Sequence, residues 1–229
     1  MGDGSKKQSP LWDARKADTE KRILTAATRL FIAEGYVATT LAAVAAEAFV
    51  GVRTVYLRFG SKAELLKRVI EVAICADTEY ADSDSDSDSD CDWAALALAA
   101  PSLEERVHAY ACGVRSLVER VGPLVTVAAE AESSEPGFVE AAQSARRAIH
   151  ASVATIWERF KTDGLLSAAV DLDWVIATAS VLGQPETYVL MTRTLEYDAE
   201  AYQVWLERMW LQMATVPGPA VARSAHGAA

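Results

Sequence analysis

Apolar residues recur along this chain at intervals of three and four positions, which is the spacing of one face of an α-helix. No stretch alternates apolar and polar residues with the period of two that is typical of a half-buried strand. We therefore expect an all-α protein of about nine helices, three of them short and the rest mostly long. The first helix is expected to end at Gly35, a residue type favoured just after a helix, and its apolar face comprises Ile23, Ala26, Ala27, Leu30 and Phe31.

Two short helices are expected after Gly35. One should start at Thr40, with an inner face of Leu41, Val44, Ala45 and Ala48. The other should cover Val52 to Arg58, with an inner face of Val55, Tyr56 and Phe59. Ser61 and Glu64 form a capping box, in which each side chain can satisfy the other residue's free backbone N–H. That box predicts a longer amphipathic helix with the apolar residues Leu65, Leu66, Val69, Ile70 and Ala73.

The second half of the chain predicts helices as well. A second capping box begins at Ser102 and predicts a helix to about Val121. Gly122 and Pro123 should end that helix and start a short one. Pro185, just after Gly183, is expected to kink a later helix. The remaining helices are expected over about residues 138–160, 173–195 and 198–213.

These elements predict two domains. Residues 19–75 should form a small N-terminal domain and residues 76–214 a larger helical one. Residues 1–18 are expected to form a flexible arm, and residues 215–229 a disordered tail. The Asp/Ser repeat at 82–92 offers no apolar side chain and repels itself, so it predicts a disordered loop. A calcium site is the alternative for this repeat, but the glycine and distal glutamate of an EF-hand loop are missing.

Charge divides the chain in the same place. The net charge of −10 argues at first against a nucleic-acid partner. Residues 1–75, however, hold 12 Lys+Arg against 8 Asp+Glu, whereas the remainder is strongly acidic. The electric field of a basic N-terminal region attached to an acidic remainder orients the basic region toward phosphate.

Composition also suggests where the chain acts. The three cysteines, Cys75, Cys91 and Cys112, form no CxxC pair, which fits a reduced, cytoplasmic setting. We find no metal-ligand spacing and no cofactor motif in the sequence. The least polar stretch, 174–191, carries polar residues and a proline, so we expect no membrane span and no membrane partner.

The two short helices, with a supporting helix on either side, have a helix-turn-helix layout. If Val55 holds the second short helix on its support, the outward positions are Val52, Arg53, Thr54, Leu57 and Arg58. Arg53 and Thr54 lie at the end of that helix that enters the major groove, where Arg can bind guanine with two hydrogen bonds. Thr40, Tyr56 and Lys62 are candidates for phosphate contacts. The alternative for Tyr56 is that its ring only packs against the core, and without the helix-turn-helix context Arg53 and Arg58 are better interpreted as solvated surface charges.

The residues of this layout resemble the N-terminal domain of the TetR family of repressors over about residues 19–74. The resemblance rests on Leu30-Phe31, Gly35-Tyr36, Thr39-Thr40, Val44-Ala45, Thr54-Val55-Tyr56, Phe59-Gly60-Ser61-Lys62 and Leu65-Leu66. It implies a homodimer on a palindromic operator in double-stranded DNA, released when a small molecule fills a pocket in the larger domain. By motif position, it implies DNA contacts from Thr40, Arg53, Thr54, Tyr56, Arg58 and Lys62.

The turn between the two short helices departs from the family. The usual Ala-Gly-Val-Ser is replaced by Ala48-Phe49-Val50-Gly51. A phenylalanine in the left-handed conformation of the family's glycine would cost about 1–2 kcal/mol. A glycine in place of the serine that caps the second helix would cost a few tenths of a kcal/mol.

The larger domain is expected to bind the ligand and to dimerise. Few charges fall on its inner faces, so we expect an apolar or aromatic effector. The candidate ligand-binding residues are Val107, Tyr110, Val114, Trp157, Trp174 and Thr178. A wide apolar stripe on the last helix predicts a dimer interface, formed by Trp205, Leu206, Met209, Trp210 and Met213.

Two other classes of function compete with a repressor. Catalysis is disfavoured because His108, His150 and His226 lie far apart and no nucleophile elbow or phosphate-binding loop occurs. A ligand- or protein-binding module with weakened DNA binding is the remaining alternative, and the substitutions at Phe49 and Gly51 motivate it.

Overall fold

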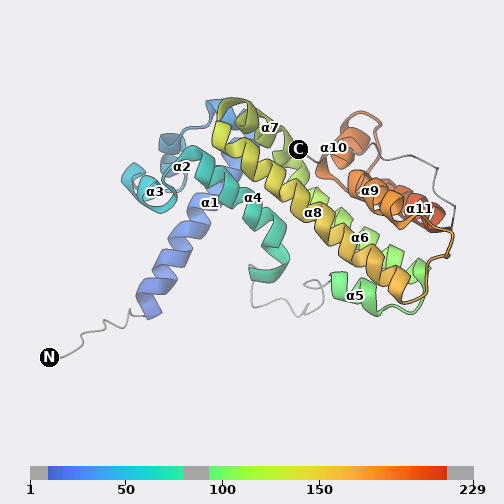
Figure 1. Cartoon of the computed structure of the whole chain (residues 1–229). Helices are drawn as coiled ribbons and strands as arrows, with labels where there is room; N and C mark the ends of the chain where they lie inside the picture. The colour runs from blue at the N-terminus through green and yellow to red at the C-terminus, as the bar shows by residue number, and fades with distance from the viewer. Residues whose placement is uncertain (1–9, 80–92, 216–229) are drawn as a thin grey trace, which may run out of the picture. The chain divides into compact units, whose positions relative to one another are not determined.

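The computed structural model describes residues 10–79 and 93–215, and within these ranges every regular element is helical. This confirms the all-α class. Figure 1 shows the helices in chain order. They are α1 (Pro10–Ala38), α2 (Leu41–Glu47), α3 (Val52–Phe59), α4 (Lys62–Glu79), α5 (Trp93–Ala99), α6 (Leu103–Val121), α7 (Val125–Ser134), α8 (Pro136–Thr162), α9 (Leu172–Leu182), α10 (Pro185–Arg193) and α11 (Ala199–Thr215), with a 3-10 turn at Gly122–Leu124.

Two of these helices differ from the sequence expectation. Helix α5 was not expected because its Ala-rich run shows no periodic apolar face; it packs through Trp93, whose ring lies 5.5 Å from that of Tyr110. The expected kink at Pro185 is a complete break, where Gly183 ends α9 and Pro185 starts α10. Proline fits the first turn of a helix because its missing N–H is not needed there.

The ends of the chain and the Asp/Ser repeat are only partly covered. Helix α1 begins at Pro10, within the stretch 1–18 for which we expected a flexible arm. Residues 14–22 are mostly good helix formers, which explains a helix without an apolar face there. Residues 1–9, the repeat at 82–92 and residues 216–229 lie outside the described residues. In the part that is described, no helix is long and apolar enough to cross a membrane.

The helices fall into two compact units. The first unit comprises residues 1–76 and 123–142, and the second comprises 77–122 and 143–229. The sequence analysis assigned α7 and the start of α8 to the larger domain. They belong to the first unit because their apolar side chains complete its core, namely Leu124, Val127, Ala131 and Phe138.

The first unit is built on α1. The side chains of Ile23, Ala27 and Phe31 are fully buried at the spacing predicted from the sequence. Val44 from α2, Val55 from α3 and Leu65 and Leu66 from α4 are buried in the same core. Burying a large apolar side chain stabilises a fold by about 1.5–3 kcal/mol, so this core fixes the short helices α2 and α3 that could not persist alone.

The core of the second unit is rich in aromatic rings. The Tyr110 and Trp210 rings are stacked with centroids 4.8 Å apart, and Trp157 meets Trp210 edge-on at 6.4 Å. Tyr110, Trp157 and Trp210 are each buried. Their helices α6, α8 and α11 therefore share one core.

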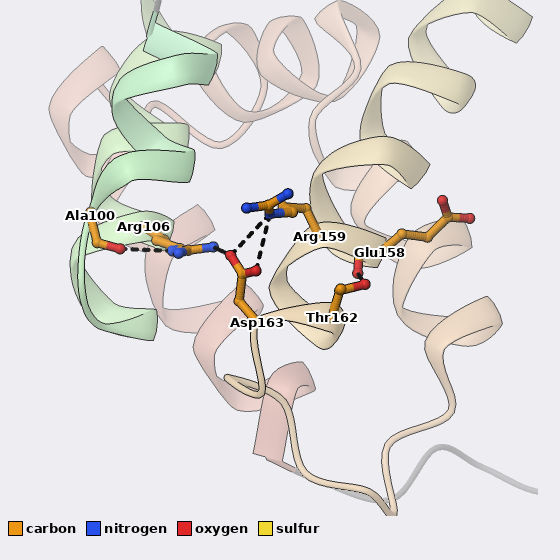
Figure 2. A network of polar contacts seen from close by, with 6 residues as sticks. All are labelled: Ala100, Arg106, Glu158, Arg159, Thr162 and Asp163. Carbon is orange, nitrogen blue, oxygen red and sulfur yellow. Dashed lines mark hydrogen bonds and ion pairs between the residues drawn. The ribbon is translucent and has the colours of Figure 1, made fainter.

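An ion-pair network joins α6 to the end of α8 within the second unit (Figure 2). The Arg106 guanidinium is buried and donates from Nη1 to Asp163 Oδ2 over 2.6 Å, while its Nε donates to the Ala100 carbonyl oxygen over 2.8 Å. Arg159 also donates to Asp163. The hydrogen bond from Arg106 is the main reason that the pKa of Asp163 is lowered.

Candidate nucleic-acid interface

Helix α3 is held by one face and exposed on the other. Val55 is fully buried beneath it, whereas Arg53, Tyr56 and Leu57 are exposed. Tyr56 was expected to face inward and to supply its phenol to phosphate; its side chain is 53% exposed, so the hydroxyl is accessible. Leu57, 75% exposed, has no packing role here and adds an apolar surface beside Arg53.

Thr39 and Thr40 are neighbours with opposite environments. Thr39 is buried and its hydroxyl donates to the Gly35 carbonyl oxygen over 2.8 Å. Thr40 is exposed and caps α2, because its Oγ1 accepts a hydrogen bond from the Ala43 N–H over 3.1 Å. The hydroxyl hydrogen of Thr40 remains available as a donor at a helix N-terminus, which is where phosphate oxygens bind well.

Arg58 does not lie with Arg53 on the exposed face of α3. Its Nη1 lies 3.4 Å from Glu20 Oε2 on α1, and only 18% of its side chain is exposed. Glu20 also pairs with Arg68 over 3.6 Å. The expectation that Arg58 faces outward is thus corrected: Arg58 joins α3 to Glu20 on α1, and Arg68 joins α4 to the same carboxylate.

Lys62 is also partly engaged inside the unit. Its Nζ donates to the carbonyl oxygens of Tyr36 at 2.7 Å and Val37 at 3.3 Å, near the end of α1. It lies 4.2 Å from the centre of the Tyr36 ring. Partial burial is the main cause that lowers the pKa of Lys62. Two of its three N–H groups are therefore committed, and one is left for an outside acceptor.

The turn between α2 and α3 has the conformation that the sequence comparison implied. Phe49 has φ of 55°, in the left-handed region, and its side chain is 87% exposed. Gly51 precedes α3 with extended backbone and supplies no side-chain cap. The helix-turn-helix geometry is retained. The backbone of Phe49 is strained, and the N-terminus of α3 at Gly51 has no side-chain cap.

Arg22 stabilises this turn, which sequence reasoning missed. Its Nη2 donates to the carbonyl oxygens of Ala48 at 2.5 Å and Phe49 at 3.2 Å. Carbonyls at the end of a helix lack intrahelical partners, and a cation there also suits the helix dipole. No local signal marked Arg22, because its partners lie 26 and 27 residues further along the chain.

Glu130 on α7 is a second residue that sequence reasoning missed. Gly35 has φ of 81° and ψ of 174°, which breaks α1 and turns the following amides outward. Glu130 Oε2 accepts hydrogen bonds from the N–H groups of Tyr36 at 2.8 Å and Val37 at 3.3 Å. No specific sequence signal marked Glu130, which shares an alanine-rich run with Glu132. We call Gly35, Tyr36, Val37 and Glu130 the α1–α7 clasp.

Four of the six candidate ligand-binding residues lie together in the core of the second unit. Val107, Tyr110, Val114 and Trp157 are all buried in its core. Trp174 and Thr178 lie on α9 and are half-buried.

The apolar stripe on α11 is mostly covered by its own chain. Leu206, Trp210 and Met213 are buried in the core of the second unit, so the expectation that they form a dimer interface is corrected. The stripe is covered by α6 and α8 of the same unit rather than by a second subunit. Trp205 and Met209 are half-buried and remain accessible.

Comparisons with known proteins agree with this geometry. Residues 23–69 match the family described as bacterial regulatory proteins, tetR family. No curated protein matches the chain.

Solved structures share the fold over nearly the whole chain. A TetR-family transcriptional regulator structure from Mesorhizobium loti is 18% identical, with a TM-score of 0.66, over 87% of this chain and 96% of that one. One from Syntrophomonas wolfei is 16% identical, with a TM-score of 0.67, over 87% and 96%. The fatty acid degradation regulator FadR from Bacillus halodurans is 14% identical, with a TM-score of 0.63, over 90% and 97%.

The matched family covers the segment that contains α2, the turn and α3, and the solved structures share the fold on both sides of it. The segment 23–69 therefore matches the tetR family, and the chain has the fold of the TetR-family regulator structures.

Proposed function

We propose that this regulator is a homodimeric repressor that binds a palindromic operator through α3 and leaves it when a small, largely apolar effector binds the second unit. The observation that carries the DNA-binding part is the exposed face of α3. A helix fixed by Val55 on one side and exposing Arg53, Tyr56 and Leu57 on the other has the arrangement of a recognition helix.

The proposed contacts divide by chemistry. Arg53 binds the two acceptors of a guanine, while Thr54 and Leu57 lie against base edges or a thymine methyl group. Thr40, Tyr56 and the uncommitted N–H of Lys62 bind phosphate oxygens, which sets the register of α3 in the groove. Arg58 is left out of this set because it pairs with Glu20.

The test is binding of the full chain to DNA from upstream of its own gene, followed by fluorescence anisotropy. We expect saturable, salt-sensitive binding that unrelated DNA does not match. Arg53→Ala should weaken specific binding about 5- to 150-fold, as expected for loss of a bidentate base contact. Lys161→Ala, an exposed charge change on α8, is the matched control and should have little effect. Equal losses in both variants would contradict a base-reading role for Arg53.

The alternative of a binding module rests on Phe49 and Gly51. The strain at Phe49 and the missing side-chain cap at the start of α3 both lower the stability of the helix-turn-helix. The same anisotropy measurement separates the two functions. A ligand- or protein-binding module would show no sequence-specific DNA binding at micromolar concentrations of the dimer.

The proposed effector chemistry rests on the aromatic core of the second unit. The Nε1–H groups of Trp157 and Trp210 are buried and have no hydrogen bond acceptor among the described residues. A buried donor without an acceptor costs about 1–3 kcal/mol. An effector that is apolar or aromatic and carries a carbonyl or ether oxygen would supply the acceptor beside Tyr110, which also lies in this core.

A thermal-shift comparison tests this chemistry. Apolar compounds bearing one carbonyl should raise the melting temperature and reduce operator binding more than hydrocarbons of the same size. Trp157→Phe keeps an aromatic ring but removes one N–H. In this variant, the effects of carbonyl compounds and of hydrocarbons on melting temperature and operator binding should therefore differ less. A series in which hydrocarbons and carbonyl compounds act alike, in the parent and the variant, would contradict the acceptor requirement.

The proposed dimer face lies on α11, on the side away from the core. A groove of about 440 Å³ is lined there by residues including Tyr197, Val204 and Trp205. Val204 is 50% exposed and, together with Tyr197 and Trp205, gives this groove an apolar surface. Val204→Glu should shift sedimentation toward the monomer, whereas Glu104→Gln, an exposed change on α6, should not.

A further inference from the structure

A cluster of three metal-ligand side chains lies between α6 and α11 in the second unit. His108 and Cys112 are four residues apart on α6, and Glu207 comes from α11. One ligand atom from each lies within 4.8 Å of the other two. None of the three takes part in the proposed DNA or effector contacts.

The distances suit a tetrahedral metal ion. Cys112 Sγ lies 3.7 Å from His108 Nε2. Zinc bonds of about 2.0 Å to nitrogen and about 2.3 Å to sulfur place two such ligands about 3.6 Å apart at a tetrahedral angle. Glu207 Oε1 is already drawn to the imidazole, at 2.9 Å from His108 Nδ1. Cys112 and Glu207 face different nitrogens of the His108 ring, so one of these two side chains has to shift toward the other nitrogen for all three to bind one ion.

Gln203 orients two of the three candidate ligands. Its Nε2 donates to Cys112 Sγ over 3.0 Å and to Glu207 Oε1 over 2.7 Å, so both atoms already act as acceptors. Gln203 is buried on α11, one turn before Glu207. Outer residues that orient metal ligands in this way change metal affinity by about 10- to 100-fold when removed.

Metal binding requires the Cys112 thiol to lose its proton. Burial, and then the charge of Glu207, raise the pKa of the Cys112 thiol, while Arg115 and the Gln203 hydrogen bond lower it. A metal ion would remove the repulsion between thiolate and carboxylate. On binding, the S–H bond breaks, the sulfur electron pair goes to the metal, and the proton passes to solvent.

We propose that His108, Cys112 and Glu207 bind a divalent transition metal ion of the zinc type, with the fourth position open to water. The combination of thiolate, imidazole and carboxylate selects such an ion over calcium or magnesium, which take oxygen ligands. The site ties α6 to α11. It does not depend on the proposed repressor function.

The sequence carried one half of the signal. His108 and Cys112 at i and i+4 share one face of a predicted helix. Glu207 lies 99 residues after His108, so only the fold shows the third ligand.

The test uses the full chain carrying Cys75→Ser and Cys91→Ser, which leaves Cys112 as the one thiol, after removal of metal with a chelator. Zn²⁺ titrated by calorimetry should bind with one equivalent per chain. Co²⁺ should bind in its place and give the near-ultraviolet absorption of a thiolate–cobalt bond. An absent absorption band, or only weak binding with no defined stoichiometry, would overturn the proposal.

Single variants in the same background assign the ligands. Cys112→Ser should abolish the cobalt band, and His108→Asn or Glu207→Gln should weaken Zn²⁺ binding by at least about 10-fold. Gln203→Ala should weaken it about 10- to 100-fold while keeping the band. Glu104→Gln, elsewhere on α6, is the control and should bind as the parent does.

Folding of each variant is checked by circular dichroism and by its melting curve without metal. The His108 side chain is 63% exposed, so His108→Asn leaves the core intact and is the decisive variant. Unchanged zinc affinity in His108→Asn would overturn the proposal even if Cys112→Ser folds poorly.

Discussion

The residues proposed to act in the two units of this protein are arranged in different ways. In the first unit, the proposed DNA contacts lie between Thr40 and Lys62, and their spacing along two short helices determines which of them face outward. In the second unit, Tyr110, Trp157 and Trp210 come from three distant helices and meet only in the folded core. Local spacing therefore indicates the function proposed for the first unit, whereas the function proposed for the second depends on tertiary packing. The predictions below test this contrast.

The largest effect is expected in the aromatic core of the second unit. Trp210→Ala removes a buried ring that contacts both Tyr110 and Trp157, and should lower the free energy of unfolding by about 3–5 kcal/mol. Trp205→Ala, on the same helix but half-buried, should cost much less and act mainly through association. Denaturant unfolding at two protein concentrations measures both. Similar, concentration-dependent losses would indicate that the whole stripe on α11 faces a second subunit.

A slightly smaller effect is expected at the α1–α7 clasp. Gly35→Ala forces a side chain into a backbone conformation suited to glycine, and its Cβ would lie 2.8 Å from the Glu130 carboxylate. Strain and the lost hydrogen bonds should together cost about 3 kcal/mol.

Gly164→Ala is the matched control for the clasp. Gly164 has φ of 77° but nothing within 4 Å of the added Cβ, so that variant should cost only about 1–2 kcal/mol. Thermal unfolding of both proteins isolates the contribution of Glu130. Equal costs would mean that the clasp adds nothing beyond backbone strain.

Repairing the turn should stabilise the first unit by a smaller amount. Phe49→Gly relieves a left-handed residue and should add about 1 kcal/mol. Gly51→Ser should add roughly a few tenths of a kcal/mol by capping α3, since the added Cβ meets Thr54 Oγ1 at an ordinary 3.8 Å. Phe49→Ala removes the ring but keeps the strain, and should give no gain. Operator affinity measured on the same proteins shows whether a more stable turn between α2 and α3 improves DNA binding.

The smallest effect concerns acid sensitivity of the second unit. Because Arg106 lowers the folded-state pKa of Asp163, this carboxylate contributes stability above its unfolded pKa of about 3.9 and loses it as the pH falls through the lower folded value. Asp163→Asn should therefore flatten the fall in melting temperature below about pH 4. Glu104→Gln, an exposed carboxylate, should leave that slope unchanged. A slope equally steep in Asp163→Asn would assign the acid sensitivity to other groups.

The sequence predicted the helices of the first unit well because their apolar spacing, glycines and caps are local signals. The same reasoning failed for Arg58, since nothing near it in the chain indicates that Glu20 draws it toward α1. It failed for α5, where an alanine-rich run shows no periodic face. It also assigned Leu206, Trp210 and Met213 to a dimer, because an amphipathic stripe does not reveal whether its own chain or a second one covers it.

The position of Glu130 has a practical consequence for engineering sensors. Exchange of DNA-binding heads between regulators is simplest when the head is one continuous stretch of chain. Here the carboxylate that satisfies the amides of Tyr36 and Val37 is encoded more than ninety residues downstream of them. A chimera joined after residue 76 would leave two amides exposed and a core without Leu124, Val127 and Ala131. A transferable head of this protein comprises two segments, residues 1–76 and 123–142.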